Sequence, residues 1–384
     1  MSTTKYSLLP TATTATEDAS LPSLRQRWTG MVSGLSRPNR FHVKSLIVII
    51  IILSVSFLWA GDVLHLMQGS GRPIPNIVHY TQLLRDPDSN LTLDFEAFMS
   101  VYAASFYYKP DHIWIHTDAP ESTIEQATSA DGEKWTRAVS KIPGVSFMPV
   151  ATPNYTASSG QKVEIIQHKS DFVRMEVMYK YGGMYMDFDV HPLRDNSPLR
   201  TAGFRNVVGR EKYNGINNGV WLSQPGTAML DIWMLEAPKT YDGAWTSHSV
   251  LLLTKIAERL VYTPKEVLIM DVKAFAPTSW EVESVQNLFG AQPHSSADWQ
   301  GHLALDTDIL DAKQRYYHPV ETKADWQMDF SSTYAIHAFK NHQSAPIKEI
   351  TPGDVLSRQS NFARAVYPAA RHAFEAGFLT LDDQ

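Results

Sequence analysis

One stretch constrains the fold of this chain more than any other: His168 to Val190, HKSDFVRMEVMYKYGGMYMDFDV. Asp171 and Arg174 are three residues apart, and residues at that spacing share one face of a helix. The pair Gly182–Gly183 ends the predicted helix, because glycine accepts the left-handed backbone at which helices stop and the chain reverses. The first part of the stretch therefore predicts a helix that presents an acid and an arginine together.

The second part of the stretch predicts a short buried strand, Met184 to Phe188, with acidic residues at its end. Asp187 and Asp189 are two residues apart, so their carboxylates are expected to point the same way. Two such carboxylates can hold one hard divalent cation, and cations of this kind commonly bridge to substrate phosphates. A nearby arginine can bind an anionic or hydroxyl-rich ligand.

The run S-D-x-x-R followed by G-G-x-Y-x-D-x-D resembles the sugar-nucleotide-binding signature of glycosyltransferase family 32. That family contains fungal Golgi mannosyltransferases and inositol-phosphoceramide mannosyltransferases. The resemblance implies an α/β fold: a GT-A-like, Rossmann-type nucleotide-sugar-binding domain with a mostly parallel central sheet, preceded by one transmembrane helix. It also implies transfer with retention of anomeric configuration. The first seventy residues carry none of this resemblance.

The resemblance implies roles for several residues of the signature. Asp187 would contact the ribose and the sugar, and Asp189 would ligate the metal directly, with Mn²⁺ expected and Mg²⁺ as the other candidate. Asp171 and Arg174 would hold the hydroxyls of the donor sugar, although their spacing also fits a surface ion pair. Tyr185 is either a donor contact or an ordinary core aromatic residue.

Further site residues are expected outside the signature. An asparagine of the G-I-N-N-G run is expected to line the sugar pocket, and Asn217 is favoured over Asn218, although both could only shape a turn. His337 is a candidate third metal ligand, but Phe339 stands where similar enzymes carry Trp. His79 and Tyr80, on the first predicted strand, are candidates to face the nucleotide.

The N-terminal region contains an apolar run, Leu46 to Ala60, that is just long enough to span a bilayer as the helix 45–61. The basic residues Arg25, Arg27, Arg37, Arg40 and Lys44 lie in the segment before it, and only Arg72 follows closely, which places the N-terminus in the cytosol by the positive-inside rule. A buried core helix and a cleaved signal peptide are the alternatives. The expected protein is a single-pass type II protein of the Golgi membrane or the endoplasmic reticulum, with a lumenal catalytic domain.

Composition excludes some classes of protein. The chain has no cysteine, so disulfides and thiolate zinc sites are excluded. The net charge is −6 and the lumenal part has no basic block, which argues against nucleic-acid binding. With 43% hydrophobic residues, the 384-residue chain can build a core without cross-links.

Strand-like and helix-like segments alternate after residue 73, a pattern that is typical of an α/β sheet. In such sheets ligands bind beyond the carboxyl ends of the strands, where Asp187 and Asp189 are expected. The predicted organisation is a disordered cytosolic tail (1–44), the membrane helix (45–61), a short stem (62–72), one catalytic domain (73–345) and a helical tail (346–384).

The expected function is a metal-dependent, retaining transfer of a hexose from a nucleotide diphosphate sugar to a glycan or lipid acceptor. GDP-mannose is the first donor considered and UDP-galactose the second. Two other classes stay open. A metal-dependent phosphohydrolase could use the same Asp pair but would need more ligands to activate water. A catalytically silent lumenal scaffold could retain the fold, which the Phe at position 339 would favour.

Overall fold

The structure is a computed structural model that describes residues 71–292, 326–339 and 349–383. The predicted cytosolic tail, the membrane helix 45–61 and most of the stem lie outside these ranges. Within them, no helix combines the length and the apolar character that a membrane span requires.

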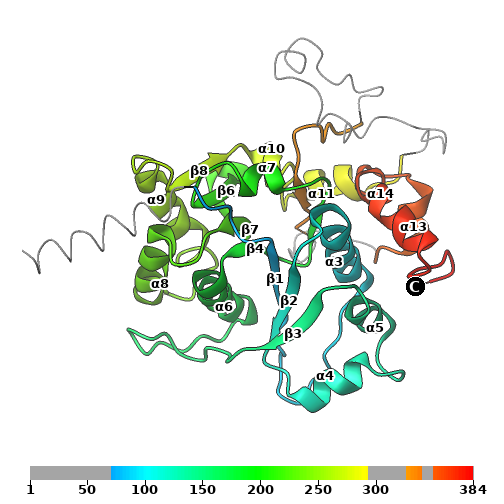
Figure 1. Ribbon diagram of the computed structural model, residues 1–384, viewed down its shortest axis with the longest axis horizontal. Coiled ribbons are helices and arrows are strands. Elements are labelled where there is room, and N and C mark those ends of the chain that lie inside the picture. Colours follow the sequence, from blue (N-terminus) through cyan, green and yellow to red (C-terminus); the bar gives the residue numbers. More distant parts are fainter. Residues whose placement is uncertain (1–70, 293–325, 340–348, 384) are drawn as a thin grey trace, which may run out of the picture. The chain divides into compact units, whose positions relative to one another are not determined.

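The centre of the molecule is a seven-stranded sheet in the order β3-β2-β1-β4-β7-β6-β8 (Figure 1). The four strands β3, β2, β1 and β4 are mutually parallel, β7 runs antiparallel to its neighbours β4 and β6, and β8 is parallel to β6. The prediction of an α/β fold with a mostly parallel sheet is confirmed. The strands are β1 Ile77–Thr81, β2 His112–Thr117, β3 Val145–Pro149, β4 Gly183–Met186, β6 Asn206–Arg210, β7 Ile216–Ser223 and β8 Val267–Met270.

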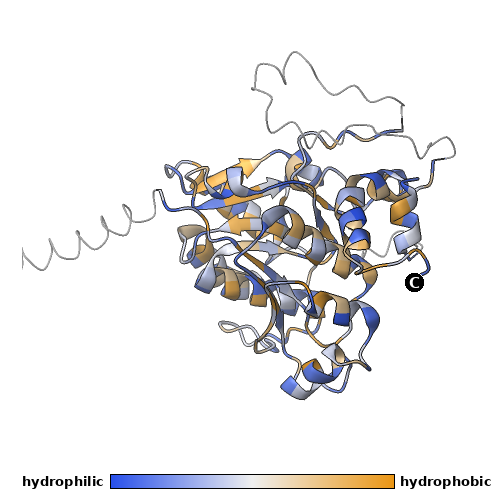
Figure 2. Ribbon diagram, turned by 45° about the vertical axis from the view of Figure 1, so that its right-hand side comes forward, coloured by the Kyte–Doolittle hydropathy of each residue, from blue (hydrophilic) through white to orange (hydrophobic). Residues whose placement is uncertain are grey.

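Helices cover both faces of the sheet (Figure 1). One face carries α3 (Phe95–Tyr108), α5 (Lys134–Ser140) and α14 (Asn361–Glu375), and the other carries α6 (Ile166–Tyr181), α8 (Ala228–Thr240) and α9 (Val250–Leu260). Each face of the sheet has its own hydrophobic core, and alternate side chains of a strand pack into the two cores. In β4, Met184 and Met186 pack into the core of the first face and Tyr185 into that of the second. Both faces of the sheet are covered by helices, and several of its strands are rich in hydrophobic residues (Figure 2).

The turn from α6 into β4 requires two glycines, as predicted. Gly182 has φ 64° and Gly183 has φ 115°, values that side chains with a Cβ rarely adopt. A Cβ on Gly182 would lie 2.7 Å from the Pro225 ring, and one on Gly183 would lie 2.4 Å from the Ile77 carbonyl oxygen. The Gly-Gly pair therefore lets β4 enter the sheet beside β1 immediately after the helix.

A second, two-stranded sheet joins distant parts of the chain. It pairs β5 (Val190–Pro192) with β9 (Ala335–His337), and Val190 lies opposite His337. The predicted strand at 334–339 is therefore present, but its partner is the segment just after the Asp pair. Helices α13 (Pro352–Ser357) and α14 follow, and Phe362 and Val366 of α14 lie in the same core as the sheet. The C-terminal helix is thus an integral part of this body.

The turn considered for the two asparagines of the G-I-N-N-G run is not formed, because residues 216–223 form β7, a central strand. Further along the chain, α11 (Val282–Phe289) packs against α14. The remaining helical elements are α4 Glu121–Thr128, α7 Ser197–Arg200, the 3-10 turn η1 Lys212–Asn214 and α10 Val272–Phe275.

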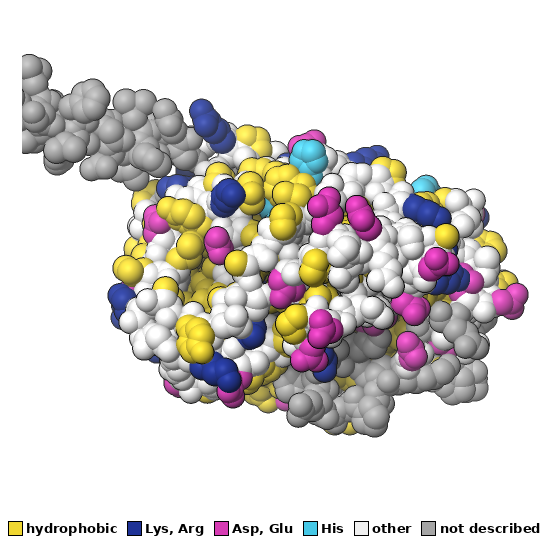
Figure 3. Space-filling view, turned by 90° about the horizontal axis from the view of Figure 1, so that it is seen from below, with side chains coloured by type: hydrophobic (Ala, Val, Ile, Leu, Met, Phe, Trp, Pro, Cys, Tyr) yellow, Lys and Arg dark blue, Asp and Glu magenta, His cyan; other side chains and the backbone are white. Residues whose placement is uncertain are grey.

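The surface carries mixed charge. On the face drawn in Figure 3, Lys and Arg side chains are dispersed among acidic and hydrophobic ones and do not gather into one patch.

Candidate active site

A cavity of about 620 Å³ opens beyond the carboxyl ends of β1 and β4. Its wall includes Thr81 to Arg85 after β1, the start of α6, and Asp187 to Asp189 after β4. Residues from the second half of the chain complete it, among them Glu211, Trp280 and Phe339. The cavity thus occupies the place where α/β sheets bind ligands.

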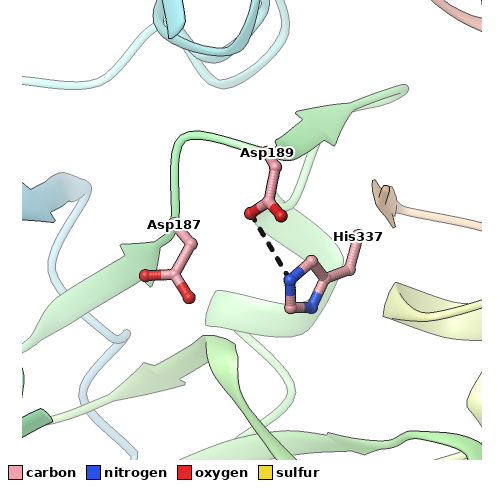
Figure 4. Close-up of side chains that lie close together, drawn as sticks. All are labelled: Asp187, Asp189 and His337. Atoms are coloured by element: carbon pink, nitrogen blue, oxygen red, sulfur yellow. Dashed lines mark ion pairs between the residues drawn. The ribbon is translucent and has the colours of Figure 1, made fainter. Parts of the chain in front are cut away.

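Three side chains in this cavity, Asp187, Asp189 and His337, offer ligand atoms within 4.8 Å of one another (Figure 4). We call them the acidic triad. Asp187 directly follows β4, and a turn closed by the Val190 N–H donating to the Asp187 carbonyl oxygen (3.0 Å) brings Asp189 beside it. The carboxylates therefore converge through a turn, and not through the alternation of a strand as predicted.

The small sheet delivers the third member of the triad. The backbone N–H of Ala338 donates to the Asp189 carbonyl oxygen (2.8 Å), and Nε2 of His337 lies 3.4 Å from Oδ1 of Asp189. Two carboxylates and an imidazole suit a transition-metal ion such as Mn²⁺, and oxygen donors also suit Mg²⁺. The described residues thus fit the predicted divalent cation, with His337 as the third candidate ligand.

The charges of the triad are mutually dependent. Burial raises the pKa of Asp187, and Arg174 opposes that effect. Burial also disfavours the charged form of Asp189, but His337 outweighs it and lowers the Asp189 pKa. Burial acts against the imidazolium of His337, yet the carboxylates, Asp189 first, raise its pKa. The positive charges of Arg174 and His337 therefore balance the two carboxylates, a task that a bound cation would share.

Asn217 and Gly219 on β7 shape the floor below the triad. The Asn217 side-chain amide lies 2.7 Å from Nδ1 of His337, and its oxygen accepts from the Gly219 N–H at 2.7 Å. A Cβ on Gly219 would lie 2.7 Å from both Oδ2 of Asp187 and Cε1 of His337. Asn217 therefore orients the imidazole, and the absent side chain at 219 leaves room for the triad.

A buried group that we call the arginine network, made of Asp171, Arg174, Asp187 and Asn218, lies on one side of the triad. The Arg174 guanidinium contacts both Asp187 oxygens, through Nη1 at 3.2 Å and Nη2 at 3.1 Å. Nη1 also donates to the Asn218 carbonyl oxygen at 2.8 Å. The arginine is 5% exposed, so it mainly fixes Asp187 from within the protein.

The other end of this network is held by a residue that sequence reasoning missed. Asp171 accepts from Nδ2 of Asn218 at 2.8 Å, and its second oxygen lies 3.0 Å from Nε2 of His248. His248 is fully buried in the turn before α9. His248 belongs to no recognisable sequence motif, and only its contact with Asp171 in the folded chain identifies it as part of the site.

Tyr185 is a core aromatic residue that also serves the site from below. Its hydroxyl donates to Oδ1 of Asp187 at 2.8 Å, and the Arg174 guanidinium lies 4.5 Å above its ring. It is fully buried and is not part of the cavity wall. Tyr185 is therefore not placed to contact the donor directly. It supports Asp187 and Arg174, which do line the cavity.

The two asparagines of β7 exchange the roles expected of them. Asn218 lines the cavity, whereas Asn217 is fully buried against His337. Neighbouring residues of a strand point to opposite faces, so only one of the two can reach the cavity wall. The geometry therefore favours Asn218 over Asn217 as the residue that lines the pocket.

His79 and Tyr80 also lie away from the cavity wall. Nε2 of His79 lies 2.8 Å from the Gly182 carbonyl oxygen and Nδ1 lies 2.9 Å from His116, and burial lowers the His79 pKa to about 4. The Tyr80 hydroxyl pairs with Ser100 at 3.1 Å. The expectation that they face the nucleotide is therefore corrected. The cavity wall at this end of β1 is formed by Thr81, the last residue of the strand, and by the four residues that follow it.

A second group, which we call the aromatic wall, adjoins the His337 member of the triad and consists of Glu211, Tyr213, Trp280 and Phe339. The Phe339 ring stacks on His337 with a centroid distance of 3.9 Å, and Trp280 meets Phe339 edge-on at 5.5 Å. Glu211 is 9% exposed and lines the cavity, and burial raises its pKa. None of these four residues except Phe339 was singled out from the sequence.

Comparison with known sequences finds the family described as "Glycosyltransferase sugar-binding region containing DXD motif", matched over residues 115–208. The chain is 22% identical over 313 residues to Glucan organizing enzyme 1 of Cryptococcus neoformans var. grubii, covering 78% of this chain and 71% of that protein. It is 35% identical over 96 residues to an uncharacterized protein of Arabidopsis thaliana, covering 24% of this chain and 14% of that protein.

Comparison with solved structures finds the PaToxG glycosyltransferase, with a TM-score of 0.38, 16% identity, and coverage of 50% of this chain and 72% of that one. The galactosyltransferase LgtC, solved with donor and acceptor sugar analogs, has a TM-score of 0.34 and 12% identity. That alignment covers 79% of this chain and all of the LgtC chain.

Proposed function

We propose a specific reaction for this chain, which is a glycosyltransferase that resembles family 32. It would transfer a hexose from a nucleotide diphosphate sugar to a hydroxyl-bearing acceptor, through a GT-A-type fold and with a divalent cation. The observation that carries the proposal is the acidic triad in the cavity at the end of β4, flanked by a buried arginine network.

The residues present divide the work of binding the donor. Asp187, Asp189 and His337 would hold the cation, Mn²⁺ by preference, which supplies positive charge to the diphosphate. The wall after β1 would hold the nucleoside, because ligands of α/β sheets lie against the ends of the strands. Asp171 and Asn218 line the cavity and would bind hydroxyls of the hexose. The Asp171 carboxylate would accept hydrogen bonds from them, and the Asn218 amide could donate or accept.

The transfer itself exchanges two bonds at the anomeric carbon. The acceptor hydroxyl oxygen forms the new bond, the bond to the diphosphate oxygen breaks, and its electron pair stays on that oxygen. The hydroxyl proton passes to the leaving diphosphate. Arg174 and Tyr185 keep Asp187 fixed during this exchange, so that little reorganisation is needed as charge develops.

The donor and the cellular setting are part of the proposal. GDP-mannose is the preferred donor, because members of the resembled family include mannosyltransferases, and a UDP-hexose is the second candidate. The apolar run at 46–60 and the basic residues before it support a type II topology in the Golgi membrane or the endoplasmic reticulum, with this domain in the lumen.

The test uses the full-length chain in detergent micelles and a panel of nucleotide sugars. Release of nucleoside diphosphate is measured with Mn²⁺, with Mg²⁺ and with EDTA. We expect release with one donor and its loss in EDTA. Asp189→Asn should lower the rate by at least about 100-fold, whereas Asp131→Asn, at an exposed turn far from the cavity, should not.

Each contrary outcome has a distinct meaning. No donor binding and no release would refute the transferase proposal and favour a silent scaffold. Release of inorganic phosphate from simple phosphate esters, with no sugar transferred, would favour a metal-dependent phosphohydrolase. Full activity in EDTA would refute the role given to the triad.

A further inference from the structure

The aromatic wall has a composition that the donor site does not explain. Glu211 is nearly buried and lines the cavity, yet no side-chain hydrogen bond to its carboxylate is found among the described residues. A nearly buried carboxylate without a hydrogen-bond donor is costly, so such a group is usually kept for a ligand. Its neighbours in the wall are aromatic rings. The ligand should therefore combine hydrogen-bond donors with an apolar face.

The rings of the wall form a continuous path from the triad to the surface. Phe339 stacks on His337, Trp280 meets Phe339, and Tyr213 lies 6.2 Å from Trp280 by ring centroids. Tyr213 is 74% exposed. The path starts at the His337 member of the triad, whereas the arginine network contacts the Asp187 member. A molecule on this path would reach the triad at His337, and not at the member that Arg174 contacts.

The backbone of this wall is strained and firmly held. Six described residues other than glycine have positive φ, and three of them, Tyr213 (65°), Asn214 (66°) and Phe339 (53°), belong to or adjoin the wall. Such conformations cost about 1–3 kcal/mol each and gather at functional sites. Glu281 holds the hairpin tip in place through Lys212 and through the Tyr213 hydroxyl at 2.6 Å.

We propose that Glu211, Trp280 and Phe339 form the acceptor subsite, and that the unit bound there is a sugar ring. A sugar ring has an apolar C–H face that packs on an aromatic plane and hydroxyl edges that donate to a carboxylate. A lipid chain has no hydroxyl that could donate to the carboxylate. A single serine or threonine side chain has no apolar face large enough to cover two aromatic rings. Tyr213 would extend the subsite to a second unit.

This inference rests on the proposed function, because an acceptor subsite has meaning only beside a donor site. It also decides between the acceptors considered: the hydroxyl that attacks belongs to a glycan, or to the sugar-like headgroup of a larger molecule, and not to a polypeptide side chain.

The test is equilibrium binding with the full-length chain in detergent. Methyl α-D-mannopyranoside, methyl β-D-galactopyranoside and methyl β-D-glucopyranoside are added with Mg²⁺ and a nucleoside diphosphate, and saturation-transfer NMR reports which glycoside binds. At least one should bind. Trp280→Ala and Glu211→Gln should each weaken its binding by at least about 10-fold. Trp280→Phe keeps a ring and should retain most of the binding.

Matched controls separate the subsite from general damage. Tyr262→Ala removes an 89% exposed ring after α9, and Glu236→Gln alters a half-buried residue of α8 outside the cavity lining, so both should bind the glycoside as the unmodified chain does. Calorimetric binding of the nucleotide sugar on the same samples reports the donor site independently.

The failure of the inference differs from the failure of the proposed function. Donor binding together with no glycoside signal, or with a signal that survives both Trp280→Ala and Glu211→Gln, would overturn the acceptor subsite alone. Absence of donor binding in every sample would overturn the proposed function, and the subsite with it.

Discussion

The two sides of the cavity are built in opposite ways. In the arginine network the polar groups satisfy one another: Arg174 holds Asp187, Asp171 holds Asn218, and His248 closes the far end. In the aromatic wall the one carboxylate, Glu211, shares the cavity lining with Trp280 and Phe339 and has no side-chain hydrogen bond among the described residues. The first side is pre-organised by its own contacts, and the second keeps hydrogen-bonding capacity for a ligand. The difference indicates that substitutions on the two sides should change stability in opposite directions.

The largest effect is expected from Arg174→Ala. It leaves the buried carboxylate of Asp171 and the partly buried carboxylate of Asp187 without their cation, which should cost about 3–5 kcal/mol of unfolding free energy and most of the activity. Urea unfolding followed by circular dichroism measures the loss. Arg371→Ala breaks an exposed pair with Glu375 and should change nothing measurable. Equal stability of the two variants would contradict the network's structural role.

Gly219→Ala should damage the triad directly, through its members Asp187 and His337. The added Cβ would lie 2.7 Å from Asp187 and from His337, so both must shift. A displacement of this size can cost on the order of 100-fold in rate. Gly353→Ala is the control, because the nearest atom to its Cβ is 3.6 Å away. Donor turnover at saturating Mn²⁺ distinguishes them, and unimpaired turnover of Gly219→Ala would show that the triad is not the cation site.

The two asparagines of β7 sharpen the comparison further. Asn217→Ala removes the amide that orients His337, and loss of such a supporting contact typically weakens metal binding by about 10–100-fold. Asn218→Ala should instead weaken donor binding and spare the metal. Titration of Mn²⁺ by electron paramagnetic resonance, followed by donor titration, measures both. The reverse pattern would restore the original preference for Asn217 as the sugar contact.

The smallest effect is a gain of stability from Glu211→Gln, by about 1 kcal/mol at pH 7. Burial raises the pKa of Glu211, so the folded state binds its proton more readily than the unfolded state does. The ionised form therefore costs stability above the unfolded pKa and costs nothing below both pKa values. The gain should shrink as the pH falls from 7 to 4. Urea midpoints at both pH values test this, and a destabilised variant would argue that Glu211 is a structural residue.

Local patterns carried much of the fold and part of the site. The helix, the glycine turn and the Asp pair follow from residues close in sequence, and the assignment as a glycosyltransferase is confirmed. The error at β7 has a physical cause: Asn and Gly favour turns in isolation, whereas pairing on both sides by β4 and β6 stabilises them as a strand. His248 and Glu211 escaped notice because each meets its partners or its cavity only through tertiary contacts.

The position of His337 in the chain has a consequence for biosynthesis. It contacts Asn217, which precedes it by 120 residues, and it reaches the acidic triad through the short strand β9. During translation the segments that carry both aspartates emerge and can fold long before β9 exists. The nascent protein should therefore acquire its cation site only near the end of synthesis. A ribosome-stalled or prematurely terminated chain would present the cavity without the histidine that completes it.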